Sequence, residues 1–177
     1  VIWNAVWGLE VPQGVSRTII LGVRLPRVLA TALCGGALAL CGAAMQGLLR
    51  NPLADGSTLG VSAGASLGAV TALLLGISFP GLPFAGTMVM AMLFAMGSLI
   101  LILSLSYSAD RGMSTQTIIL MGVVFSMFAT SIISLLTAFS GEKLRSITFW
   151  TMGSLSGAGY TETLVLLGAL AVFGGVL

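Results

Sequence analysis

Residues 46–65 decide the fold, and they read Gln46-Gly-Leu-Leu-Arg-Asn-Pro-Leu-Ala-Asp55-Gly-Ser-Thr-Leu-Gly-Val-Ser-Ala-Gly-Ala65. They join two long apolar segments through one short polar turn. Pro52 lacks a backbone N–H and pushes Asn51 out of helical geometry, so a helix must end here. Asp55 or Ser57 can then cap the next helix by accepting hydrogen bonds from its free N–H groups. The stretch therefore predicts a helical hairpin.

Small residues recur every four positions in both segments, which places them on one face of each helix. In lipid the hydrophobic effect does not drive helices together. Helices associate instead through close backbone contact, which small residues allow. We therefore expect a tightly packed hairpin at the centre of a membrane bundle. The two rows are Gly35, Ala39, Ala43 and Gly47, and Gly60, Gly64, Gly68, Ala72 and Gly76.

The composition indicates an integral membrane protein. Of the 177 residues, 57% are hydrophobic and 7% charged, whereas a soluble domain has about 25% charged residues. The net charge of +2 is too small to imply binding to nucleic acid. The chain has no histidine, the commonest metal ligand and general base, and it has no carboxylate pair or cluster of metal ligands. We expect no catalytic residue, no metal site and no cofactor.

These features predict an all-α, polytopic transmembrane helical bundle in a single domain, residues 1–177. A membrane-spanning helix needs about 20 apolar residues. Residues 1–23 are mixed in character, and Trp3 and Trp7 suit a membrane interface, so this segment is expected to lie outside the bilayer against its surface. Because the sequence starts at Val1 and stops within an apolar run, we expect a fragment. The expected spans are residues 25–49, 59–77, 84–106, 114–139 and 160–177.

Local signals locate several helix ends. Pro26 is expected in the first turn of the first span, where its missing N–H has no cost. Ser114 is expected to cap the fourth span. Between the fourth and fifth spans, residues 147–152 are expected to form a short interfacial helix anchored by Trp150.

The fourth expected span carries hydroxyl groups on one face. Ser126, Thr130 and Ser134 follow Gly122 at intervals of four. They either line a water-filled path, or bond to carbonyl groups one turn back or on other helices. From the residues alone, the second interpretation is favoured.

Basic residues give an orientation signal. The positive-inside rule would place the more basic side, which includes the N-terminal segment, in the cytoplasm. That side carries Arg17, Arg24, Arg27, Lys143 and Arg145, and the other carries Arg50 and Arg111.

Three motifs follow one another along the chain: Arg24-Leu-Pro-Arg27, then Gly42-Ala-Ala-Met-Gln46-Gly-Leu-Leu-Arg-Asn51-Pro-Leu-Ala-Asp55, then Leu59-Gly-Val-Ser-Ala-Gly64-Ala. Their order and spacing resemble the permease subunit of type II ABC importers, the family that carries iron-siderophores, haem, cobalamin and, in some members, molybdate. The resemblance continues through residues 113–117 and 149–153. It implies the second to sixth helices of a ten-span subunit about twice as long.

The resemblance implies that Arg24 and Arg27 dock a partner. In the family, the arginines of this motif face the periplasm and bind acidic residues of a substrate-binding protein, and guanidinium groups suit such salt-sensitive pairs. This places the N-terminal side in the periplasm, against the positive-inside count. The alternative is that both arginines only snorkel at the interface.

The resemblance also implies a pathway and a gate. The family's fifth helix lines the central pathway at the dimer interface, which implies that Ser126, Thr130 and Ser134 line it here. Gln116 is larger than the small polar residues that family members commonly carry at this point, and Asn51 could equally be a simple turn residue. The implied cytoplasmic gate residues are Asn51, Leu53, Ser114, Thr115 and Gln116.

The implied function is the membrane-spanning permease component of an ATP-driven importer, which moves a metal chelate (iron-siderophore, haem or cobalamin) from a periplasmic binding protein into the cytoplasm. The implied partners are a second copy of the permease, ATP-binding cassette ATPase subunits, a periplasmic substrate-binding protein and the lipid of the plasma (inner) membrane. The phosphate-binding motif GxxxxGK[ST] does not occur, so a separate subunit would hydrolyse ATP, and this chain is not expected to be an enzyme. The alternatives are half of a secondary carrier or channel, and a structural membrane-assembly subunit.

Overall fold

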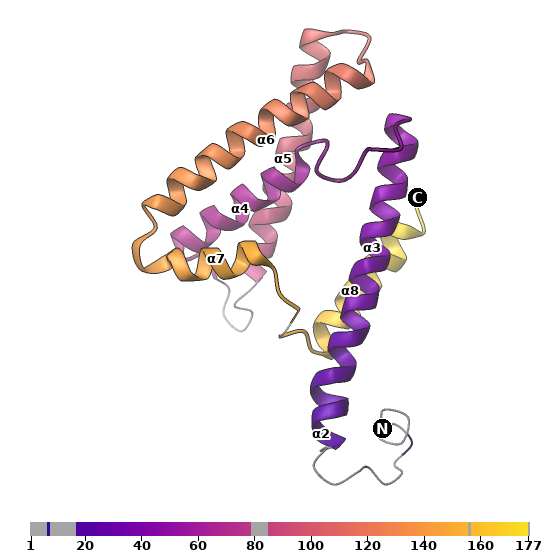
Figure 1. Ribbon diagram of the computed structural model, residues 1–177, viewed down its shortest axis with the longest axis vertical. Helices are drawn as coiled ribbons and strands as arrows, with labels where there is room; N and C mark the ends of the chain where they lie inside the picture. The colour runs from indigo at the N-terminus through magenta and orange to yellow at the C-terminus, as the bar shows by residue number, and fades with distance from the viewer. Residues whose placement is uncertain (1–6, 8–16, 79–84, 156, 177) are drawn as a thin grey trace. The chain divides into compact units, whose positions relative to one another are not determined.

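The computed structural model describes residues 7, 17–78, 85–155 and 157–176 (Figure 1). Within these ranges the chain is helical and contains no strand, so the all-α prediction is confirmed. Trp3 and most of the segment 1–23 lie outside the described residues. The elements are α2 (Arg17–Ile19), the π-helical η1 (Ile20–Arg24), α3 (Leu25–Leu49), α4 (Val61–Leu75), α5 (Ala85–Ala109), α6 (Thr115–Ala138), the 3-10 helix η2 (Gly141–Lys143), α7 (Leu144–Met152) and α8 (Tyr160–Gly174).

Three helical stretches among the described residues are long and apolar enough to cross a membrane: Ile20–Leu49, Ala85–Ala109 and Thr115–Ala138. The shorter apolar helices α4 and α8 have 15 residues each, or roughly 22 Å against a hydrocarbon core of about 30 Å. That they too cross the bilayer stays a prediction.

The chain divides into two compact units. One comprises residues 1–44 with 154–177, and the other comprises residues 45–153. The expectation of one transmembrane domain over residues 1–177, and of packing between the small-residue rows of α3 and α4, stays a prediction.

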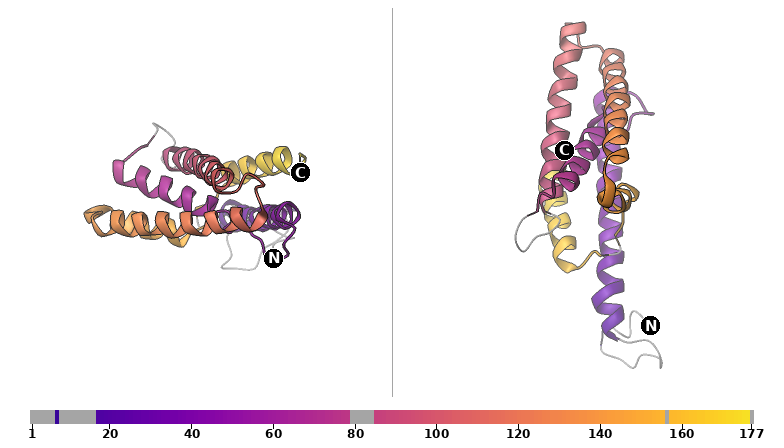
Figure 2. Two further views of the ribbon diagram at one scale, coloured as in Figure 1. Left: turned by 90° about the horizontal axis from the view of Figure 1, so that it is seen from above. Right: turned by 90° about the vertical axis from the view of Figure 1, so that its left-hand side faces the viewer.

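In the unit of residues 45–153, α4, α5 and α6 pack against one another (Figure 2). The glycines of α4 make this contact possible. A Cβ added at Gly64 would overlap the side chain of Ser98, and one added at Gly68 would overlap the carbonyl oxygen of Met90. The glycine row of α4 is therefore a packing surface, and it faces α5.

In the other unit, the first long helix starts earlier than predicted. The segment α3 begins at Leu25 with Pro26 in its first turn, as predicted, but helical structure already runs from Arg17 through η1 into it. The expectation that the missing N–H of Pro26 has no cost is therefore wrong. A proline ring inside an α-helix clashes with the carbonyl group one turn earlier. Here a wider π turn precedes the ring, since the N–H of Leu25 bonds to the oxygen of Ile20, five residues back.

Two other expectations about helix ends can be compared with the structure. Ser114 does cap α6, accepting a hydrogen bond from the N–H of Thr117 at 3.4 Å. The short helix expected over residues 147–152 is α7, which begins three residues earlier at Leu144.

Candidate functional site

The turn after α3 has a defined backbone geometry. Arg50 adopts a left-handed conformation (φ 48°), the N–H of Asn51 bonds to the oxygen of Gln46 at 3.2 Å, and the N–H of Arg50 bonds to that of Gly47 at 3.4 Å. This pair of bonds is the Schellman arrangement that ends many helices. The helix therefore stops before Pro52, where the sequence predicted.

Asn51 builds the next part of the turn. Its side-chain oxygen accepts a hydrogen bond from the N–H of Leu53 at 3.0 Å, and its backbone oxygen accepts one from Ala54 at 3.1 Å. Leu53 projects from this turn with 87% of its surface exposed. Asn51 thus stabilises the turn through its hydrogen bonds. The side chain of Leu53 is exposed and available for contacts outside this turn.

Asp55 organises the following turn rather than capping α4. One of its carboxylate oxygens accepts hydrogen bonds from the hydroxyl and N–H of Ser57 (2.6 and 2.9 Å) and from the hydroxyl and N–H of Thr58 (2.9 and 3.0 Å). These bonds, first those of the two hydroxyl groups, hold the pKa of Asp55 below its usual range. The N-cap of α4 is Gly60, with no side-chain cap, so the prediction of an Asp55 or Ser57 cap is wrong.

The loop between α3 and α4 rests on α6. Gly60 has a left-handed conformation (φ 73°), and a Cβ there would lie 2.9 Å from the oxygen of Gly122. A Cβ at Gly122 would in turn lie 2.5 Å from the oxygen of Thr58 and 3.0 Å from the Cα of Leu59. Two glycines therefore let the backbones of loop and helix touch. Beneath the loop Leu49, Ala54 and Leu59 form a buried apolar cluster.

The loop between α5 and α6 is organised by a second aspartate. Asp110 accepts hydrogen bonds from the N–H groups of Gly112 (2.9 Å) and Ser114 (3.0 Å) and from the hydroxyl of Thr117 (3.3 Å). Hydrogen bonding by Ser114, and then by the N–H of Gly112, lowers the pKa of Asp110. The sequence analysis did not identify this network, although an Asp four residues before an N-cap Ser could have indicated it.

The predicted gate residues occupy two separate loops. Asn51 and Leu53 belong to the α3–α4 loop, which meets α6 at Gly122. Ser114, Thr115 and Gln116 begin α6, with Ser114 and Gln116 exposed and Thr115 half-buried. Eight residues at 1.5 Å each separate Ser114 from Gly122, roughly 12 Å along the helix.

The hydroxyl groups of α6 donate within their own helix. Ser126 bonds to the oxygen of Gly122 at 2.8 Å, and Ser134 bonds to that of Thr130 at 2.9 Å. Ser126 and Ser134 therefore bond to carbonyl groups one turn back, which is the interpretation that the residues alone favoured. Thr130 and Ser134 are nevertheless exposed and Ser126 is half-buried, so their remaining lone pairs stay available as acceptors.

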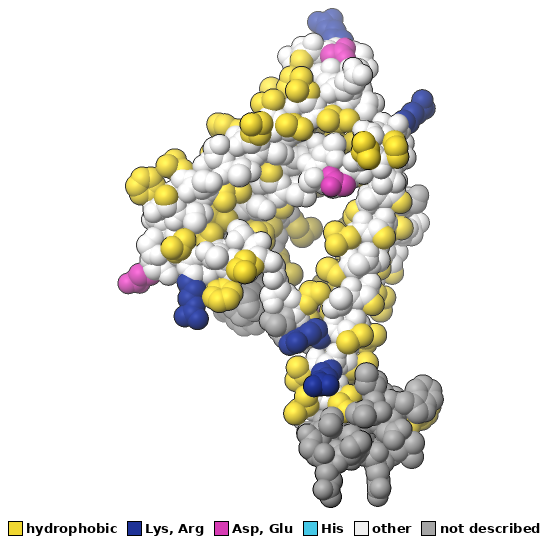
Figure 3. All heavy atoms as spheres, in the orientation of Figure 1, with side chains coloured by type: hydrophobic (Ala, Val, Ile, Leu, Met, Phe, Trp, Pro, Cys, Tyr) yellow, Lys and Arg dark blue, Asp and Glu magenta, His cyan; other side chains and the backbone are white. Residues whose placement is uncertain are grey.

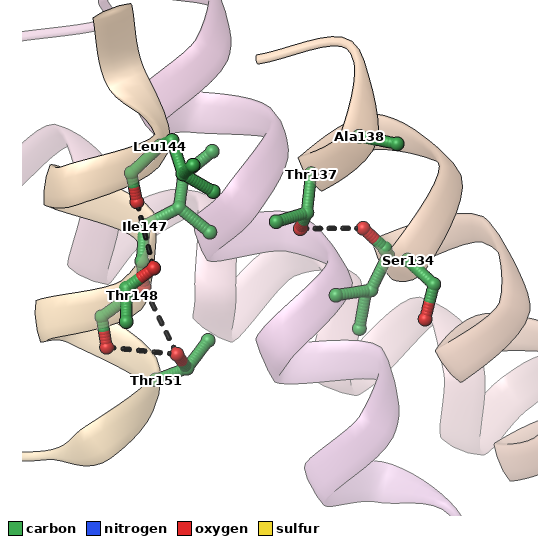
Figure 4. Close-up of a pocket in the computed structure, with 8 residues that line it drawn as sticks. Ser134, Thr137, Ala138, Leu144, Ile147, Thr148 and Thr151 are labelled. Carbon is green, nitrogen blue, oxygen red and sulfur yellow. Dashed lines mark hydrogen bonds between the residues drawn. The ribbon is translucent and has the colours of Figure 1, made fainter. Parts of the chain in front are cut away.

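A groove of about 500 Å³ lies between the end of α6 and α7 (Figure 4). Thr148 and Thr151 of α7 line it, each donating a hydrogen bond one turn back in its own helix, to Leu144 at 2.8 Å and to Ile147 at 3.0 Å. The sequence analysis missed these two threonines, although their spacing of three places them on one helix face. The groove is lined by Ile133, Ser134, Thr137, Ala138, Leu144, Ile147, Thr148 and Thr151.

Few contacts hold α7 in place. Ile147 is its buried residue, at 1% exposure. Just before the helix, the ammonium of Lys143 donates a hydrogen bond to the oxygen of Leu74 at 2.8 Å, in the last turn of α4. A cation at this end of a helix satisfies a free carbonyl and complements the helix dipole.

Arg24 and Arg27 lie in the other unit and are both exposed. Arg24 ends η1, and Arg27 lies in the first turn of α3. Figure 3 shows basic side chains near the ends of the elements, with hydrophobic and uncharged surface along their length. Among the residues that the structure describes, no three His, Cys, Asp or Glu gather as a metal site would require.

Comparison with known proteins gives related sequences over most of the chain. The sequence profile of the FecCD transport family matches residues 1–177. The uncharacterized ABC transporter permease protein YvrB of Bacillus subtilis is 42% identical over 149 residues, which is 84% of this chain and 42% of that protein. The molybdate import system permease protein MolB of Haemophilus influenzae is 38% identical, covering 93% of this chain and 47% of MolB. The vitamin B12 import system permease protein BtuC of Salmonella newport is 36% identical, covering 85% and 45%.

A solved structure is also similar. Its description reads "An inward-facing conformation of a putative metal-chelate type ABC transporter", and it matches with a TM-score of 0.74 and 33% sequence identity, over 92% of this chain and 53% of that one. The chain spans about half the length of the curated relatives it matches.

Proposed function

Because this chain belongs to the FecCD transport family, we propose that it is part of the membrane permease subunit of an ATP-driven importer. The resemblance to ABC importer permeases is confirmed by the family and by its relatives, and with it the location in the plasma (inner) membrane as a multi-pass protein. We propose that the rest of the machine comprises a second permease copy, ATPase subunits that hydrolyse the ATP, and a periplasmic substrate-binding protein.

The cargo that fits best is a metal chelate such as an iron-siderophore, haem or cobalamin. The observation that carries this choice is the state of the hydroxyl groups on α6 and α7. Ser126, Ser134, Thr148 and Thr151 each donate their hydroxyl hydrogen within their own helix. These four hydroxyls therefore offer acceptors, and the two threonines add methyl groups. A small oxoanion such as molybdate needs hydrogen-bond donors or cations, whereas a bulky chelate can pass a weakly polar wall without being retained.

Arg24 and Arg27 are proposed to dock the binding protein. Both are exposed, and guanidinium groups form bidentate pairs with carboxylates while exposed charge steers a reversible partner. The periplasm is then the side of η1 and the start of α3.

The cytoplasmic gate is proposed to use the two aspartate-organised loops. Leu53 is the gating side chain that the geometry favours, because it is exposed on a hydrogen-bonded turn. Asn51 and Ser114 would act by shaping the loops that carry the gate, and Thr115 and Gln116 would contribute at the start of α6.

Uptake by proteoliposomes that contain the complete subunit, its ATPase and its binding protein tests this proposal. ATP-dependent uptake of radiolabelled cobalamin, haem or a ferric siderophore would support it. ATP-dependent uptake of molybdate alone would refute the cargo class. Uptake driven by an ion gradient without ATP would indicate a secondary carrier, and a folded assembly that moves none of these would indicate a structural subunit.

A further inference from the structure

The π turn η1 leaves one backbone carbonyl group without its usual partner. In an α-helix the oxygen of Leu21 would accept from the N–H of Leu25, and in a π-helix from that of residue 26. The N–H of Leu25 points to Ile20 instead, and Pro26 has no N–H. The oxygen of Leu21 must therefore find a donor outside its own helix or remain unpaired, which is costly away from water.

The helix α8 supplies that donor, and beside it a hydroxyl whose single hydrogen lies between two carbonyl oxygens. The hydroxyl of Tyr160 donates to the oxygen of Leu21 at 2.6 Å. The hydroxyl of Thr163 lies 3.3 Å from the oxygen of Pro26, and 2.7 Å from that of Gly159 in its own helix. Residues three apart share a helix face, so one face of α8 contacts the carbonyl group of Leu21 inside the π turn and that of Pro26 just after it.

This contact is partly buried, because Tyr160 is 46% exposed and its bond to Leu21 is accessible. Thr163 is 6% exposed, and Pro26 is among the fully buried side chains, as is Ile20. Arg24 and Arg27 are exposed. Pro26 and Thr163 are therefore shielded, while Tyr160 and both arginines are exposed.

We propose that Tyr160 and Thr163 are positioning residues for binding-protein docking, because they fix the π turn that sets the orientation of Arg24 and Arg27. This inference rests on the proposed docking role of the two arginines. Forming or resolving a π turn rotates the residues before it by about 100° relative to those after it. Arg24 is the last residue of η1 and Arg27 lies beyond it, so losing the turn would rotate both arginines together relative to the segment that precedes η1.

The test measures binding of the importer's own substrate-binding protein to the complete subunit, assembled with its ATPase in lipid nanodiscs. Tyr160→Phe and Thr163→Val each remove one hydroxyl and keep the shape. Each should weaken docking about three-fold, and together about ten-fold, as expected for lost neutral hydrogen bonds. Tyr107→Phe and Thr71→Val are matched controls. Tyr107 is an exposed tyrosine of α5, and Thr71 donates within α4; both variants should bind as the wild type does.

A double-mutant cycle separates positioning from a general structural effect. In the Arg24→Gln, Arg27→Gln background, removing the α8 hydroxyls should cause no further loss, whereas independent, additive losses would overturn the inference. If the arginine variants lose docking but Tyr160→Phe with Thr163→Val does not, the docking role stands and the positioning role fails. If the arginine variants bind normally, the docking proposal itself fails.

The conservative variant Thr163→Ser keeps the hydroxyl and provides a check that does not depend on Thr163→Val folding well. It should bind within about two-fold of the wild type, well inside the effect expected for a lost hydrogen bond. A ten-fold loss in Thr163→Ser would show that packing of the methyl group, rather than the hydrogen bond, matters, and would overturn the inference.

Discussion

Gly122 is where the candidate gate loop touches the candidate pathway helix, and replacing it with alanine tests that contact. The added Cβ would lie 2.5 Å from the oxygen of Thr58 and 3.0 Å from the Cα of Leu59. Both are backbone atoms of a loop held by hydrogen bonds, so they cannot move aside as a flexible side chain would. Overpacking of this kind costs about 1–3 kcal/mol.

The matched control is Gly97→Ala in the middle of α5, where a Cβ meets no atom within 4 Å. Alanine favours a helix over glycine by up to about 1 kcal/mol, so this variant should be neutral or slightly more stable. The two substitutions are chemically identical and both lie inside helices, so the gain in helix propensity cancels and their free energies of unfolding should differ by the overpacking cost of about 1–3 kcal/mol.

The assay is thermal denaturation of the complete subunit in detergent, followed by the fraction that remains monodisperse after heating, with denaturant titration where unfolding is reversible. Gly122→Ala should denature at a clearly lower temperature than both the wild type and Gly97→Ala. If the two variants behave alike, the loop does not press on α6 at Gly122, and the mechanical link between gate loop and pathway helix is refuted.

Three further predictions concern the loops and α7. Lys143→Met should lower the free energy of unfolding by about 0.5–1 kcal/mol through loss of the carbonyl cap on α4, measured as a lower midpoint that Lys143→Arg restores; no change would show that the contact to Leu74 contributes nothing. The folded-state pKa of Asp110 is lowered, so its stabilising contribution is present above the ordinary pKa of 3.8 and is lost as the pH falls through the lowered pKa. Asp110→Asn should flatten this acid dependence of the melting temperature. An unchanged pH profile would contradict the prediction. Leu53→Ala should leave the melting temperature unchanged, because the side chain is 87% exposed, but should raise ATP-independent leak of cargo from proteoliposomes; an unaltered leak would remove Leu53 from the gate.

The sequence predicted what depends on neighbouring residues. The end of α3 at Leu49 follows from Asn51 and Pro52, whose local geometry excludes a continued helix. Ser114 was predicted as the cap of α6 on the same local grounds, and the structure confirms it. Apolar length alone was enough to indicate the long helices.

The errors arose where a residue had more than one local option. Pro26 lies in the first turn of α3 as predicted, but the sequence did not indicate that a π turn would extend the helix before it. Asp55 can accept hydrogen bonds at the start of a helix or within a turn. Here the hydroxyls of Ser57 and Thr58 donate to it and hold it in the turn.

Contacts between distant segments could not be predicted from one sequence. The residues joined by the hydrogen bond from Tyr160 to Leu21 are 139 positions apart in the sequence. No local sequence pattern predicts this hydrogen bond. The touching backbones at Gly60 and Gly122 likewise appear in the sequence only as two glycines. The function of a glycine that permits close approach becomes visible once its partner is known.

We propose that this chain is part of an importer permease, with Arg24 and Arg27 outside the cell and the loop that carries Leu53 inside. Single cysteines at positions 24 and 53, placed in the complete subunit after Cys34 and Cys41 are replaced by serine, test it with a membrane-impermeant thiol reagent applied to intact cells and to inverted vesicles. Both positions are exposed. We predict that position 24 is labelled only in intact cells and position 53 only in inverted vesicles. The reverse pattern would support the positive-inside count, contradict the docking role of Arg24 and Arg27, and favour a secondary carrier.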